Sequence, residues 1–169
     1  MNTKLITLAA IIFAIAIFRL VPHLPNVSPV AAMALFGGAY FTDKRLAFIV
    51  PFLALLLSDL IIGFHNTMIF VYAGFALTVC IGIWLQRNIT LTRVTASAVA
   101  ASVLFFLITN LGAWMTWALY PMTLDGLMQA YVAGIPFFQN SLLGNLVFTA
   151  VMFGGYALVH SHSPRKAGI

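Results

Sequence analysis

Apolar residues run through the chain in long blocks, and short polar segments separate these blocks. A helix needs about 20 apolar residues to cross the hydrocarbon core of a bilayer. Six blocks suit such helices, although the second of them is short. The pattern predicts an all-α, polytopic membrane protein whose six transmembrane helices form a single domain over residues 1–169. The predicted spans are residues 4–21, 28–41, 45–63, 67–86, 93–119 and 140–160.

Two segments of this pattern need a separate interpretation. The first block follows Lys4 and also fits a cleavable signal peptide. Because Arg19 and another apolar segment come directly after it, we expect a retained helix. Residues 120–139 mix an aspartate and amides with aromatic side chains, and they contain Gly134 and Pro136. This mixture predicts an outer lid loop, either a structured loop or a short amphipathic helix.

The composition excludes a soluble globular protein. Charged residues make up 7% of the chain and hydrophobic residues 63%, whereas soluble domains carry roughly 25% charged residues. The eight lysines and arginines outnumber three aspartates, and in a membrane protein this excess indicates topology rather than nucleic-acid binding. If both termini are cytoplasmic, seven of the eight face inward, namely Lys4, Lys44, Arg45, Arg87, Arg93, Arg165 and Lys166. The positive-inside rule therefore predicts an inner membrane protein, in contact with the lipid bilayer, with both termini in the cytoplasm.

Apart from the basic residues that begin three of the predicted spans, two charged residues fall inside the spans. Arg19 lies three residues before the outer end of the first span, and Asp59 lies four residues before the outer end of the third. An unpaired charge in hydrocarbon costs several kcal/mol, so these side chains of similar depth are predicted to form a structural ion pair. A direct contact with a ligand is the alternative.

Candidate ligand-binding residues gather in the outer loops and in the outer halves of the spans. Histidines in such loops are also common as interfacial hydrogen-bonding groups, tryptophans as interface anchors, and asparagines as links between helices. Both interpretations stay open for these side chains. The candidates are His23, Asn26, His65, Asn66, Tyr72, Asn110, Trp114, Tyr131, Asn140 and Asn145.

The chain has one cysteine, Cys80, in the predicted fourth span. A single cysteine excludes an internal disulfide framework and any multi-cysteine metal site. Such a residue is most often a small packing group, and among apolar neighbours its thiol stays protonated unless a metal displaces the proton. The sequence also contains no phosphate-binding loop and no nucleophile elbow. We therefore expect no ATP hydrolysis by this chain.

The chain resembles the substrate-binding S-components of energy-coupling factor transporters, and within them the solitary BtuM-type vitamin B12 transporters. The resemblance depends on the six short spans, the outer loops, the small-residue face at Ala10 and Ala14, the run from Arg19 to Val30, and Cys80. It implies that Cys80 ligates the cobalt of cobalamin and assists the removal of cyanide. It also implies that Ala10 and Ala14 can contact a coupling subunit.

These observations predict binding of cobalamin and its uptake across the inner membrane. A thiolate is a soft, strongly donating cobalt ligand, so cyanide on the opposite face of the corrin would be labilised. Decyanation assisted by Cys80 would be the protein's enzymatic activity, secondary to transport. Two alternatives remain: an S-component-like transporter of another vitamin or small solute, and a membrane partner subunit that does not transport.

Overall fold

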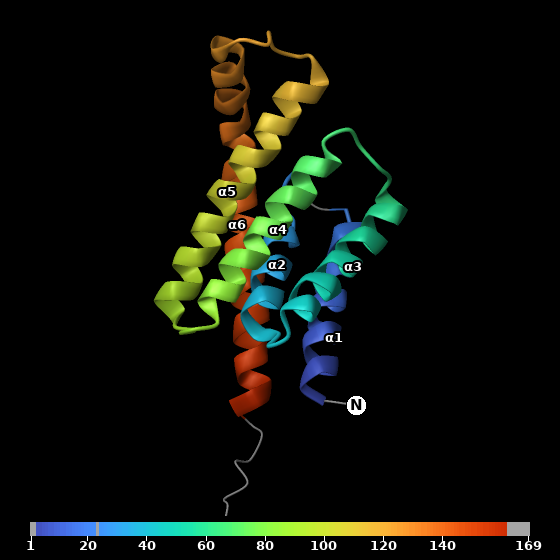
Figure 1. Ribbon diagram of the computed structural model, residues 1–169, viewed down its shortest axis with the longest axis vertical. Coiled ribbons are helices and arrows are strands. Elements are labelled where there is room, and N and C mark those ends of the chain that lie inside the picture. The colour runs from blue at the N-terminus through green and yellow to red at the C-terminus, as the bar shows by residue number, and fades with distance from the viewer. Residues whose placement is uncertain (1–2, 23, 162–169) are drawn as a thin grey trace, which may run out of the picture.

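The protein is all-α in the computed structural model, which describes residues 3–22 and 24–161 (Figure 1). This confirms the helical bundle predicted from the apolar blocks. The elements in chain order are α1 (Thr3–Ile17), the short 3-10 helix η1 (Phe18–Leu20), α2 (Val30–Tyr40), α3 (Lys44–Ile62), α4 (Met68–Leu85), α5 (Leu91–Trp117) and α6 (Leu124–Ser161).

Five of the described helical segments are long and apolar enough to cross a membrane. They are Thr3–Leu20, Lys44–Ile62, Met68–Leu85, Leu91–Trp117 and Leu124–Val159. The exception is α2, whose 11 residues span only about 17 Å at 1.5 Å per residue. All of α2 except Tyr40 is buried, and it packs against α3, α4 and α6. The second predicted span is thus the central helix of the bundle and crosses only part of a bilayer.

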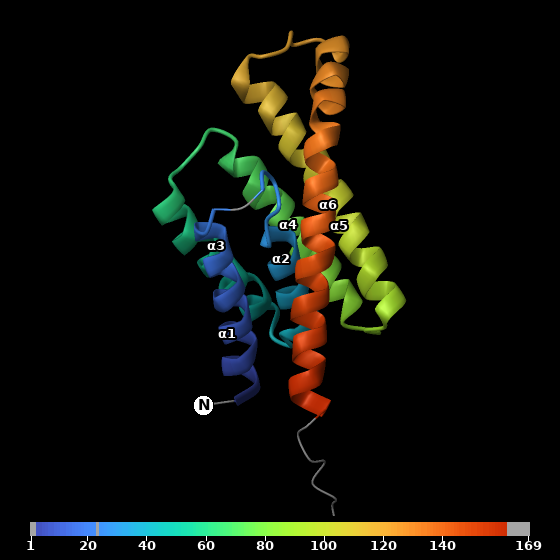
Figure 2. The same cartoon turned by 180° about the vertical axis from the view of Figure 1, so that it is seen from behind.

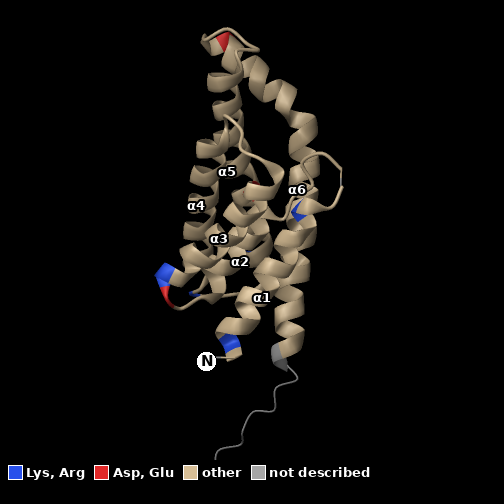
Figure 3. Cartoon of the chain, turned by 90° about the vertical axis from the view of Figure 1, so that its right-hand side faces the viewer, with Lys and Arg blue, Asp and Glu red and all other residues tan. Residues whose placement is uncertain are grey.

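The helices run up and down, so their connectors collect at two ends of the bundle (Figures 1 and 2). The α2–α3 and α4–α5 connectors lie at the end where α1 begins, and the α3–α4 and α5–α6 connectors lie at the opposite end. The first end, here called the basic end, carries Lys4, Lys44, Arg45, Arg87 and Arg93, whereas the other end, here called the far end, carries Asp125 (Figure 3). Both α5 and α6 extend beyond the other helices at the far end.

Residues 124–139 of the predicted lid form the first part of α6, so the loop alternative is wrong there, and the alternative of a short helix is correct except that this helix continues into the last span. Thr123 begins this helix, because its hydroxyl accepts a hydrogen bond from the Gly126 amide at 3.2 Å. Gly134 lets α6 lie directly on α5, since a Cβ at that position would be 2.9 Å from the ring of Phe106. Packing against α5 therefore maintains a helix through Pro136, which by itself costs a backbone hydrogen bond.

α2 and α4 cross with their backbones in contact. A Cβ added to either Gly38 or Gly82 would be 2.8 Å from the Cα atom of the other glycine, so the two backbones touch. Gly82 belongs to a buried stripe of small residues on α4 that also includes Gly74 and Thr78. Small residues of this kind allow membrane helices to approach closely.

We expect Gly82→Ala to lower the free energy of unfolding by about 1–3 kcal/mol, because the new methyl group has no space between two backbones. Chemical unfolding in detergent measures the change. Gly154→Ala is the matched control, since a Cβ at Gly154 meets no atom within 4 Å. Equal stability of the two variants would show that the α2–α4 crossing is looser than described.

Candidate functional site

A cavity of about 600 Å³ opens in the half of the bundle nearer the far end. Its wall consists of residues from η1, the start of α2 and the connector before it, the α3–α4 connector, α4, α5, the α5–α6 connector and α6. This volume falls within the roughly 300–1,000 Å³ that is typical of sites for small organic ligands. The cavity is therefore the candidate functional site.

Aromatic rings dominate the walls of the cavity. Phe106 of α5 packs against Phe138 of α6 with ring centroids 4.9 Å apart, and both rings line the cavity. Such rings offer flat apolar surfaces on which a ligand ring can stack. The other aromatic lining residues are Phe105, Trp114, Trp117, Tyr120 and Phe137.

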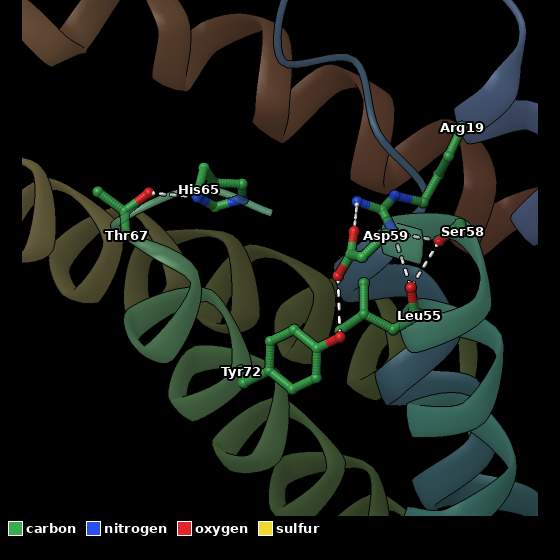
Figure 4. A network of polar contacts seen from close by, with 7 residues as sticks. All are labelled: Arg19, Leu55, Ser58, Asp59, His65, Thr67 and Tyr72. Carbon is green, nitrogen blue, oxygen red and sulfur yellow. Dashed lines mark hydrogen bonds and ion pairs between the residues drawn. The ribbon is translucent and has the colours of Figure 1, made fainter. Parts of the chain in front are cut away.

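A few polar groups interrupt these apolar walls. The amide nitrogen of Asn110 donates to the Phe106 carbonyl at 2.9 Å, and its side-chain oxygen has no hydrogen-bond donor among the described residues. His65 Nδ1 is 2.8 Å from the hydroxyl of Thr67, and the other ring nitrogen is similarly without a described partner (Figure 4). Both side chains line the cavity, and each has one atom that can form a hydrogen bond with a ligand.

The buried polar residues of the cavity wall include Asn145 and Ser102. Asn145, 2% exposed, donates from α6 to the Ser102 hydroxyl at 2.8 Å and to the Ala98 carbonyl at 2.9 Å, both on α5. Both hydrogens of the Asn145 amide are therefore used within the protein. This residue fixes α6 against α5 and gives the wall a defined shape.

Arg19 brings a charge to the cavity wall, and the structure pairs it with Asp59 (Figure 4). The two side chains meet at 2.7 Å, and Asp59 is only 2% exposed. The Tyr72 hydroxyl donates to the second carboxylate oxygen at 2.9 Å, and Arg19 also donates to Ser58 and to the Leu55 carbonyl. This network joins η1, α3 and α4, so the charge of Arg19 is balanced before any ligand enters.

Comparison with known proteins gives one match. A family model described as a family of unknown function, DUF6580, matches residues 1–166. The chain belongs to this family. The match covers every helix and all of the cavity of this DUF6580 protein. The search of curated proteins found no match, and neither did the search of solved structures.

Half of the predicted ligand-binding residues line the cavity of the DUF6580 protein. The cavity-lining candidates are Asn26, His65, Asn110, Trp114 and Asn145. His23 lies outside the described residues.

The other four candidates do not line the cavity, and for three of them a hydrogen bond explains why. Tyr72 donates to Asp59, Tyr131 donates to the Leu107 carbonyl at 2.9 Å, and Asn140 donates to the Pro25 carbonyl at 3.2 Å. Asn66 is exposed in the α3–α4 connector. These four side chains therefore do not line this cavity, and their role in ligand binding stays a prediction.

Cys80 is also separate from the cavity. It lies 12 residues after the first residue of α4, a distance of about 18 Å along the helix, and its side chain is exposed. It lines a different surface pocket together with Lys44, Ile83, Trp84, Gln86 and Arg87. The structure thus does not bring Cys80 together with the amides and rings that were predicted to surround the same ligand.

Most of the aromatic residues that line the cavity, and the small residues between their rings, were not predicted from the sequence. A signal was present, because Phe106, Asn110 and Trp114 follow one another at intervals of four on α5. On α6, six lining residues also keep helical spacing: Ala130, Gly134, Phe137, Phe138, Ser141 and Asn145. This face extends across the boundary between the predicted lid and the predicted sixth span, and its periodicity appears only when the two segments are taken as one helix.

The described lining of the cavity is suited to binding. The described lining residues include no carboxylate and no cysteine. The described residues also contain no cluster of three or more His, Cys, Asp or Glu that could hold a metal ion. Ring stacking and a small number of hydrogen bonds are what this arrangement offers a ligand.

Proposed function

We propose that this membrane protein binds a vitamin-sized organic solute in the cavity and carries it across the membrane. One observation supports this proposal above all: membrane-spanning helices enclose a cavity of about 600 Å³ with aromatic walls and unused hydrogen-bonding groups. Polar groups inside a membrane protein are costly and are commonly functional. A bundle without a ligand would be more stable with these positions apolar and the space filled.

The chemistry of the lining indicates an uncharged solute that carries at least one ring. The cation of the wall, Arg19, is already paired with Asp59, so a charged ligand would find no free counter-ion among the described lining residues. A ligand ring can stack on Phe106, Phe138 or Trp114. Asn110 can accept a hydrogen bond from a ligand N–H or O–H group, and His65 can donate or accept one.

The direction of uptake follows from the charges of the two ends. We infer that the basic end faces the cytoplasm of a cell with an inner membrane, because Lys and Arg collect on the cytoplasmic side of short loops. The cavity then opens toward the outer side, where a nutrient arrives. This orientation places both termini in the cytoplasm.

Cobalamin is the solute implied by the resemblance to BtuM-type transporters. A corrin has the apolar rim and the amide groups that rings and Asn110 could accommodate. Cobalt ligation by Cys80 would need a second site, because Cys80 lies on the exposed face of α4 and not in the cavity. We therefore propose a smaller ring-bearing solute as the first candidate for this S-component-like transporter, and cobalamin as the second.

The test is a ligand screen with the purified protein. We expect one ring-bearing, uncharged vitamin-sized compound to stabilise the protein, by about 2.7 kcal/mol at a concentration 100 times its Kd. The measurement is the thermal unfolding midpoint in detergent across a panel of water-soluble vitamins that includes cobalamin. A panel without any stabilising compound, together with no uptake by cells that produce the protein, would contradict a transport function.

We expect Cys80→Ala to bind the stabilising solute with an affinity within about twofold of the unmodified protein, a difference below 0.5 kcal/mol, because the sulfur does not line the cavity. Isothermal titration compares the two proteins. A visible spectrum of added cyanocobalamin is recorded in parallel. If the unmodified protein gives a thiolate-ligated cobalt spectrum that Cys80→Ala lacks, Cys80 is a cobalt ligand and the order of the two candidate solutes is reversed.

A further inference from the structure

A separate pocket lies at the basic end, where α3 begins and α4 finishes. Lys44 is the first residue of α3, and Arg87 follows the last residue of α4 by two positions. Gln86 donates a hydrogen bond to the Phe41 carbonyl, which ties the end of α4 to the connector that leads into α3. This bond explains why two cations that are far apart in the sequence line one pocket.

The charges of this pocket are not neutralised within the protein. Neither Lys44 nor Arg87 forms an ion pair with a described residue. The nearby carboxylate of Asp43 accepts a hydrogen bond from the backbone amide of Arg45 at 2.8 Å, where it caps α3. The pocket therefore attracts an anion.

The remaining wall of the pocket is apolar and continues into the membrane. Cys80, Ile83 and Trp84 complete the lining, and Trp84 is 51% exposed. Leu77 lies on the same helical face one turn before Cys80, and it is 45% exposed. An indole beside cations at the end of a spanning helix is typical of the membrane interface. The exposed face of α4 at Trp84, Cys80 and Leu77, here called the α4 strip, thus leads from the two cations toward the hydrocarbon core.

We propose that this pocket is a binding site for an anionic phospholipid. The phosphate lies between Lys44 and Arg87, and an acyl chain follows the α4 strip from Trp84 to Leu77. A basic pocket gives about 1 kcal/mol per cation toward anionic lipid at a membrane surface, and the apolar strip favours a lipid over a free anion. The site is independent of the cavity and of the solute that the cavity binds.

The experiment measures lipid binding to the purified full-length chain. Native mass spectrometry in detergent counts the bound lipids as phosphatidylglycerol or phosphatidylcholine is added. We expect a bound phosphatidylglycerol that phosphatidylcholine does not replace. The double variant Lys44→Gln/Arg87→Gln should bind phosphatidylglycerol roughly 30-fold more weakly, since it loses two cations.

A matched double variant controls for the overall charge. Lys4→Gln/Arg45→Gln removes two cations from the same end of the bundle, and neither residue lines the pocket. This control should keep the affinity of the unmodified chain. An equal loss in both double variants would indicate diffuse charge attraction and would overturn the site. Glycerol phosphate, which has no acyl chains, should not compete, and effective competition by it would overturn the assignment to a lipid.

Discussion

Asp59→Asn is expected to lower the free energy of unfolding by about 3–5 kcal/mol, the usual result of leaving a buried charge without its partner. The substitution keeps the shape of the side chain and leaves the Arg19 guanidinium opposite a neutral amide. The Tyr72 hydroxyl also loses its charged acceptor. Chemical unfolding in detergent measures the loss. Asp125→Asn is the control, because Asp125 is exposed at the far end.

A double variant separates a structural role of the pair from a role in ligand binding. Arg19→Met/Asp59→Leu removes both charges and should recover most of the lost stability, because apolar side chains often replace a buried ion pair without cost. If Asp59→Asn instead has normal stability and binds the solute more weakly, the pair serves the ligand. That result would revive the alternative in which Asp59 or Arg19 contacts the solute directly.

The second large effect is expected from filling the cavity. Ala113 of α5 lines the cavity, and Ala113→Phe would place a ring in the space that the solute occupies. We expect the affinity for the stabilising solute to fall about 100-fold, or 2.7 kcal/mol, while the protein stays folded. Isothermal titration gives the affinity, and thermal unfolding without solute shows whether the fold is intact.

Ala100→Phe is the matched control for this substitution. Ala100 is also on α5, but its side chain is exposed and does not line the cavity. A ring at this position should enter lipid and leave the affinity unchanged. Unchanged affinity in Ala113→Phe as well would mean that the solute binds elsewhere, and the proposed function would then lose its site.

The sequence predicts helices well where an apolar block and a capping residue agree. Asp43 caps α3 and Thr90 caps α5, each through its side-chain oxygen, and both helices begin next to these residues. The continuity of α6 was not predicted, because Gly134 and Pro136 ordinarily interrupt a helix. The packing of Gly134 against α5 overrides this local preference, and a tertiary contact of that kind has no local signal.

The candidate site was predictable where a polar residue stands out from an apolar background. Asn110, Asn145 and His65 were found in this way, and all three line the cavity. The orientation of Cys80 had one signal in the sequence, because the stripe of small residues at Gly74, Thr78 and Gly82 marks the packed face of α4 and Cys80 lies outside this stripe. Hydropathy gave no further signal, since α4 is apolar on every side.

The short central helix accounts for the existence of the cavity. The central helix α2 is about 17 Å long, whereas the hydrocarbon core of a bilayer is about 30 Å thick. The axis of the bundle is therefore left without a helix over the remaining depth. Val30 and Ala31, the first two residues of α2, line the cavity at this point. The cavity thus lies where the central helix α2 does not extend. Relatives with different side chains can therefore keep the same chamber and line it for a different solute.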